Sequence, residues 1–172
     1  METQYRQYIT FKDPNVAKIC IDTWSSDGKG LTYSDAAKPN GFGSPSVFRL
    51  KASLLYFDEF RFFTNVKTLQ SQAFYNCTGM LSITTPPTLI SLAGSCFRNT
   101  GGPSSGGHLV ITFLCDQVMG VSSTALTNVN TNPFYGAYTR VQNIRVPADL
   151  VQSYKDHWFW GAVLADKIIA IE

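Results

Sequence analysis

The most constraining feature of this chain is a pattern that occurs twice between residues 66 and 100. Residues 66–77 and 89–100 both read aliphatic-x-x-Leu-x-x-x-small-Phe-x-Asn-Cys/Thr, and their phenylalanines, Phe74 and Phe97, are offset by 97 − 74 = 23 positions. Self-similarity at a fixed period of about 20–50 residues is the sequence signature of repeat architectures. Each unit has an apolar face that it cannot bury alone, so stacking on the next unit completes the core. The pattern therefore predicts a stack of similar turns of chain.

The apolar runs that flank the two copies predict short strands. Residues 81–84 alternate and end at two prolines, and residues 109–113 follow the second copy at an offset of 109 − 81 = 28. The five extra positions lie beside residues 101–107, a glycine- and serine-rich stretch that is typical of a loop insertion. Residues 143–146 and 167–171 are two further strand candidates. We expect strand-containing turns with irregular outer loops.

The order Phe-x-Asn-Cys, Leu-x-Ile, Pro, Leu-x-x-Leu-x-x-x-x-Phe resembles the BspA-type leucine-rich repeat. Residues 144–155, continued through Trp158 to Ile168, resemble the way in which such proteins close. The resemblance covers about residues 57–172. It implies an α+β, β-rich fold, a short leucine-rich-repeat solenoid of few irregular turns. We expect caps at both ends, a small N-terminal helix-loop-helix piece and a C-terminal helix. It also implies an origin in gut Bacteroidales bacteria or in their phages.

The chain divides into an N-terminal extension, residues 1–45, and a repeat domain, residues 46–172. In the extension, residues 8–11 predict a short strand. Residues 39–45 contain two prolines and two glycines and are the most linker-like stretch of the chain. The repeat domain is then expected to begin with a strand at residues 47–50.

A helix is expected to begin at Asp13 and Pro14, and residues 22–37 after it resemble an EF-hand or dockerin-like calcium loop. Such a loop needs oxygen ligands at alternate positions, a glycine for the sharp turn and a terminal bidentate acid. Here Trp24 or Ser25 replaces the second acidic ligand, Gly30 is an insertion, and the last acid is aspartate. A loop that keeps its shape without an ion is therefore the alternative to a metal site. If calcium binds, the predicted ligands are Asp22, Ser26, Asp27 and Asp35.

A dense aromatic segment lies near the C-terminus, after a helix that is expected to start with Pro147. Two interpretations stay open for it. It can cap the last repeat, or it can be a candidate binding surface that stacks on a glycan or contacts a partner. The residues are His157, Trp158, Phe159 and Trp160.

The residue types that carry catalysis do not form a recognisable pattern. His108 and His157, the two histidines, lie in no catalytic motif, and Cys-x-x-Cys and His-x-x-x-His spacings are absent from the sequence. Asp58 and Glu59 are adjacent on a short turn, so they cannot flank one glycosidic bond. We expect no enzyme, and no cofactor apart from the candidate calcium ion. The four cysteines are expected to be reduced and buried.

Charge and hydropathy restrict the partners further. Fourteen basic and twelve acidic residues give a net charge of +2, without the clustered basic residues of a nucleic-acid-binding protein. The sequence contains no apolar stretch of the roughly 18 residues that a membrane span needs. The first residues include no apolar run typical of a signal peptide, which favours a protein that stays in its cell or leaves in a virion.

These observations lead to two hypotheses of function. The first is a non-enzymatic structural or attachment component of a phage virion, in the tail, fibre or capsid decoration. It would act through protein–protein or host-surface binding, as an oligomer or a many-copy assembly. The alternative is a bacterial cell-surface or extracellular adhesion module that binds a host protein or glycan. A charged content of 15%, against a usual value of about 25%, suits packing against neighbours but equally suits a β-rich domain with a Ser/Thr/Asn surface.

Overall fold

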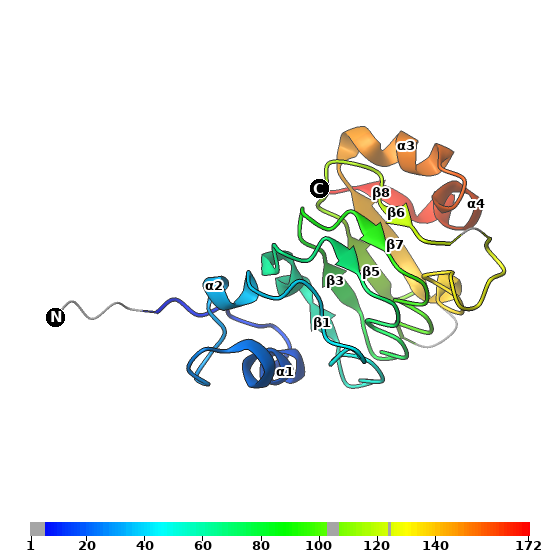
Figure 1. Ribbon diagram of the computed structural model, residues 1–172. Helices are drawn as coiled ribbons and strands as arrows, with labels where there is room; N and C mark the ends of the chain where they lie inside the picture. The colour runs from blue at the N-terminus through cyan, green and yellow to red at the C-terminus, as the bar shows by residue number, and fades with distance from the viewer. Residues whose placement is uncertain (1–5, 103–106, 124) are drawn as a thin grey trace.

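The computed structural model describes residues 6–102, 107–123 and 125–172. Residues 1–5, and residues 103–106 within the expected loop insertion, lie outside the described part. Helices α1 (Pro14–Trp24) and α2 (Tyr33–Ala36) lie beside strand β1 at one end of the molecule. Helices α3 (Val151–Asp156) and α4 (Trp160–Leu164) cover the opposite end (Figure 1).

The strands form two sheets in which every pairing is parallel. The larger sheet has the order β1 (Tyr56–Phe57), β3 (Ser82–Thr84), β5 (Leu109–Thr112), β7 (Val141–Val146), β8 (Ile168–Ala170). The smaller sheet has the order β2 (Thr68–Leu69), β4 (Ser91–Leu92), β6 (Gly120–Val121). From β1 to β7 the chain visits the two sheets alternately, so successive turns of chain lie on one another. This mixed architecture with parallel sheets agrees with the α+β class expected from the sequence.

The larger sheet has one buried face, which explains its alternating sequence. In β5 the burial alternates strictly, with Leu109 and Ile111 buried and Val110 and Thr112 half-buried. Neighbouring strands place large apolar side chains in register, because β-branched and aromatic residues pack well on a pleated surface. The resulting buried row consists of Phe57, Ile83, Ile111, Ile144 and Ile168.

A row of four stacked phenylalanines forms the core beneath the connecting turns. Ring centroids are 5.5 Å apart between Phe48 and Phe74, 5.6 Å between Phe74 and Phe97, and 5.2 Å between Phe97 and Phe134. Backbone hydrogen bonds fix this row, since the Phe74 amide donates to Cys96 and the Phe97 amide to Pro133. The repeat expected from two phenylalanines therefore extends to four, and Phe48 and Phe134 were not predicted.

Two positions after each of these phenylalanines the backbone is left-handed. The φ angles are 63° at Leu50, 56° at Asn76, 53° at Asn99 and 71° at Gly136. Asparagine tolerates this conformation, and the Asn99 amide donates to the Asn76 side chain over 3.0 Å. Gly136 adopts its left-handed conformation without the strain that a side chain would add. Leu50, in contrast, adopts a conformation that costs free energy for an ordinary side chain.

Three local expectations were wrong. Residues 47–50 are not a strand but part of a turn over residues 43–50, because the Val47 and Arg49 amides donate to carbonyls a few residues earlier in the chain. The strand expected at residues 8–11 is a single antiparallel bridge between Tyr8 and Thr32. Pro147 has an extended ψ of 140° and caps a 3₁₀ helix (Ala148–Leu150) that leads into α3, rather than being the first helical residue.

Side chains from both ends close the stack. The Asp13 carboxylate caps α1 by accepting the Asn15 amide, as expected, and also accepts the Leu55 amide at the start of the first turn. At the other end, the Tyr154 hydroxyl accepts the Met119 amide and the Trp160 indole donates to the Met119 carbonyl, both over 2.8 Å. Both ends are thus tied to the repeat by hydrogen bonds, part-buried at Asp13 and buried at Met119.

The four cysteines are buried and unpaired, as expected. Burial raises the pKa of the Cys77 thiol to about 12 and the pKa values of Cys20 and Cys96 still further. No helix within the described ranges has both the length and the apolar character that crossing a bilayer requires.

Candidate binding surface

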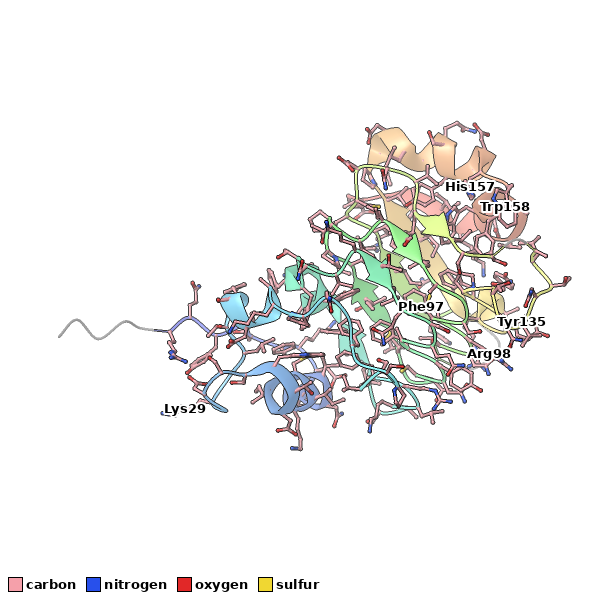
Figure 2. All side chains as sticks on the ribbon, in the orientation of Figure 1. Lys29, Phe97, Arg98, Tyr135, His157 and Trp158 are labelled. Carbon is pink, nitrogen blue, oxygen red and sulfur yellow. The ribbon has the colours of Figure 1, made fainter. Side chains whose placement is uncertain are left out.

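Immediately after each phenylalanine of the core row comes a polar side chain that is at least partly exposed, since the first three of these residues are half-buried and the last is 36% exposed. These residues alternate between arginine and tyrosine, and we call them the Arg–Tyr strip: Arg49, Tyr75, Arg98 and Tyr135. The guanidinium carbon of Arg49 lies 5.2 Å from the centre of the Tyr75 ring. Arg98 lies between two rings, 5.4 Å from Tyr75 and 5.5 Å from Tyr135. Figure 2 shows Arg98 and Tyr135 side by side at the margin of the molecule, with Phe97 inside.

The backbone fixes the spacing of the strip. The Leu50 amide donates to the Tyr75 carbonyl, and the Asn76 and Asn99 amides donate to the carbonyls of the next strip residues, over 2.8–3.2 Å. Chain segments paired in this way lie about 4.8 Å apart, as neighbouring strands do. Arg49 and Arg98 are separated by one tyrosine turn, so their backbones are roughly 10 Å apart.

The strip has a positive charge that nearby acidic residues do not neutralise. Residues 36–57, 60–115 and 117–148 contain no aspartate or glutamate, and all four turns of the strip lie within these segments. The ion pairs found in the described part of the chain are Arg6–Asp27, Lys18–Asp22 and Lys38–Asp35, all in the N-terminal extension. Within the described ranges, Arg49 and Arg98 therefore have aromatic rings but no carboxylate as partners.

The hydrogen-bonding groups of the strip are also unused. The buried Nε atoms of Arg49 and Arg98 have no acceptor among the described residues. An arginine carries five N–H donors in a planar fork that matches a carboxylate or sulfate. Stacking between rings holds that fork in place, so less side-chain entropy is lost when an anion binds. The strip is thus a preorganised row of cations and aromatic edges.

Two of the predicted calcium ligands, Ser26 and Asp27, are linked by the cationic side chain of Arg6. Arg6 donates to Ser26 over 3.2 Å and to Asp27 over 3.1 Å, and the Tyr8 hydroxyl donates to Asp27 over 2.6 Å. The hydrogen bond from Tyr8, with help from the Lys29 amide, lowers the pKa of the Asp27 carboxyl from 3.8 to about 2.

The other two predicted ligands, Asp35 and Asp22, differ in their hydrogen-bond partners. Asp35 is only 1% exposed and accepts hydrogen bonds from Lys38, Thr32 and Ser26. Burial alone would raise its pKa, but these donors outweigh burial and lower it. Asp22 lies outside this network and pairs with Lys18 over 2.7 Å. A recess of about 420 Å³ beside the network is lined by Arg6, Lys38 and Asp35, among others.

The structure therefore joins three of the four predicted ligands through hydrogen bonds and leaves Asp22 apart. In residues 6–102, 107–123 and 125–172, no three His, Cys, Asp or Glu side chains are grouped so that they could hold a metal ion. The loop keeps the expected helix-loop-helix order, and Arg6 and Lys38 supply positive charge to its carboxylates. These contacts test neither calcium binding nor its alternative, the ion-free loop, and we expect the ion-free loop because Asp27 and Asp35 already pair with cations.

The aromatic segment His157–Trp160 divides between core and surface. Phe159 and Trp160 are fully buried, and the Trp160 ring lies 5.6 Å from the ring of Phe134, so these two residues cap the core and cannot form a surface. Trp158 is 50% exposed, and the centre of its ring lies 5.9 Å from the centre of the His157 ring. Only this pair remains as a candidate surface, and Figure 2 places it at the C-terminal end, apart from Arg98.

Comparison with known proteins agrees with the repeat. Residues 51–105 match the family described as "BspA type Leucine rich repeat region (6 copies)". This segment includes strands β1 to β4 together with Phe74 and Phe97. No curated protein matches the chain. Over residues 51–105 the protein is thus similar to a BspA-type leucine-rich repeat region, and this similarity supports a role in protein–protein interaction or adhesion.

Proposed function

We propose that this protein is a non-enzymatic binding module, a short leucine-rich-repeat solenoid that holds a partner against the outer side of its turns. The observation that carries the proposal is the Arg–Tyr strip. Its side chains are partly exposed, follow one another on successive turns and are held by the same backbone hydrogen bonds that align the phenylalanine core. A rigid surface loses little conformational entropy on binding, which favours affinity.

Two settings follow from the sequence and are proposals of the same kind. In the first, the module is a component of a phage virion that contacts other virion proteins or the host surface. In the second, it is a bacterial cell-surface module that adheres to a host protein or glycan. Both settings use one surface in the same way, and they differ in whether copies of the chain assemble with each other.

The first experiment measures the mass of the native species by light scattering, with and without calcium. A discrete oligomer supports the virion component, and a monomer supports the adhesion module. A calcium-dependent mass would support a metal site at Asp22, Ser26, Asp27 and Asp35.

The second experiment tests binding itself, with the chain immobilised and exposed to a glycan array and to purified bacterial and host surface proteins. The double variant Arg49→Gln/Arg98→Gln is measured beside the parent. Self-association or a partner that depends on these arginines supports the binding module. If parent and variant are both monomeric and give identical profiles, the strip is not a binding surface and the proposal is wrong.

A further inference from the structure

We infer that the partner held along the Arg–Tyr strip is a linear acidic polysaccharide, a sugar chain that carries carboxylate or sulfate groups at regular intervals. This inference rests on the proposed binding function and names the chemistry of its partner. Four properties of the strip support it: its charge, its spacing, its free hydroxyl groups and its satisfied backbone.

The charge of the strip requires an anion. Arg49 and Arg98 have no carboxylate partner among the described residues, and the surrounding segments of sequence contain no acidic residue that could compete. Lys51, two positions beyond Arg49 in the sequence, is exposed and carries a further positive charge. Cation–π contacts leave the positive charge in place, so the guanidinium groups still attract carboxylate or sulfate.

The spacing of the charges matches a polymer with alternate acidic units. The strip offers a cation at every second turn, with backbones roughly 10 Å apart. A pyranose ring spans roughly the distance between two turns. A chain with an acidic group on every second sugar can therefore place its anions opposite Arg49 and Arg98 and its intervening sugar opposite Tyr75.

The tyrosines provide hydroxyl groups that can hydrogen-bond to a sugar and an aromatic face on which a sugar ring can stack. The hydroxyl groups of Tyr75 and Tyr135 have no hydrogen-bond partner among the described residues, and each can donate to or accept from a sugar hydroxyl. Tyr135 is 36% exposed and has a cation on one side only, from Arg98. Its other side can stack on the apolar face of a sugar ring.

The same features disfavour a peptide and a single-stranded nucleic acid. A peptide that adds as a strand pairs with free backbone groups, but the amides of the strip residues already donate within their own turns, for example Arg49 to Ser46 and Arg98 to Ser95. A single-stranded nucleic acid stacks successive bases on several open aromatic faces, whereas of the two strip rings only Tyr135 has an open side and Tyr75 is covered by Arg49 and Arg98. An acidic sugar chain needs neither free backbone nor an open face at Tyr75.

The test measures binding of the full chain to hyaluronan, which carries a carboxylate on every second sugar, and to heparin, with dextran as the neutral polymer and polyglutamate as the acidic peptide, by biolayer interferometry. The double variant Arg49→Gln/Arg98→Gln is compared with Arg61→Gln/Lys67→Gln, which removes two exposed cations away from the strip. Both variants lower the net charge equally. Circular dichroism checks that both remain folded.

We expect binding to at least one acidic polysaccharide and none to dextran. Affinity should fall about tenfold or more in the strip variant, because one charge-assisted hydrogen bond is worth at least that factor, and less than about threefold in the control. An equal loss in both double variants would overturn the inference, because binding would then depend on overall charge alone. Preference for polyglutamate would also overturn it, in favour of an acidic protein partner.

Failure of the inference can be distinguished from failure of the binding function. If no acidic polysaccharide binds but another partner depends on Arg49 and Arg98, the polysaccharide is wrong and the binding module stands. If nothing that binds depends on these arginines, both are wrong.

Discussion

Replacing Phe97 with alanine tests whether the stacked phenylalanines hold the repeat together. Phe97 is completely buried, and its ring lies between those of Phe74 and Phe134, at 5.6 and 5.2 Å and with interplanar angles of 14° and 19°. Alanine would therefore remove the contact on both sides at once. The two neighbouring rings cannot close the gap, because backbone hydrogen bonds between turns fix their separation.

The size of the effect follows from the buried surface. A buried aromatic side chain removes about 150–250 Å² from water, and at about 25 cal/mol per Å² this amounts to about 4–6 kcal/mol. Alanine retains a small part of that area, so the expected loss is about 3–5 kcal/mol, in the range measured for Phe→Ala in protein cores. For a chain of this length each kcal/mol lowers Tm by about 2–4 °C, which predicts a decrease of roughly 6–20 °C.

Urea denaturation followed by tryptophan fluorescence is a suitable assay, because Trp24 and Trp160 lie at opposite ends of the stack. Coincident transitions by tryptophan fluorescence and by circular dichroism would justify a two-state free energy. Tyr135→Ala is the control, since Tyr135 is an exposed aromatic residue in an adjacent turn. If Phe97→Ala loses no more stability than this control, the phenylalanine row is not the core of the repeat.

Four further predictions concern other parts of the chain. Leu50→Asn should raise the free energy of unfolding by about 1 kcal/mol, because asparagine tolerates the left-handed conformation, and unchanged or reduced stability in urea would contradict this. The Asp27 carboxyl has a pKa of about 2 in the folded protein, so its contribution to stability is complete above about pH 4 and is lost as the pH falls toward 2. Tyr8→Phe should weaken this dependence, and denaturation curves at pH 5 and pH 2.5 would measure the change. The four buried thiols should not react with a thiol reagent at pH 8 until denaturant is added, and rapid labelling of the native protein would show that one is accessible. Tm should be the same in calcium and in chelator, because Arg6 and Lys38 already pair with the carboxylates of the loop, and a calcium-dependent increase in Tm would show a real site.

The sequence alone reveals the repeat only where its spacing is regular. Phe74 and Phe97 are 23 positions apart and share a following asparagine, whereas Phe134 comes 134 − 97 = 37 positions later and is followed by Tyr135 and Gly136. A loop lengthens that interval, so the repeat is no longer visible as a regular spacing in the sequence. Phe134 nevertheless stacks on Phe97 in the structure. Phe48 falls in a predicted strand because the sequence of a short apolar run does not distinguish a turn from an extended segment.

The second sheet could not be predicted for a different reason. Each of its strands contributes two residues, too few for alternation to be visible. The Arg–Tyr strip has no local signal at all, since its members come from four turns and meet only after those turns are aligned. The candidate calcium loop shows the opposite case, because its sequence order was recognisable but its charges are balanced by Arg6, which lies before the predicted motif.

The surface and the interior of this stack repeat with different periods. Inside, every turn contributes a phenylalanine, so one turn is the unit. Outside, arginine and tyrosine alternate, so the unit is a pair of turns. A longer version made by adding a single turn would keep the core continuous but bring two like side chains together, either two cations or two phenols. Adding turns in pairs would lengthen both patterns without a break, and the exterior therefore sets the rule by which this protein can be extended.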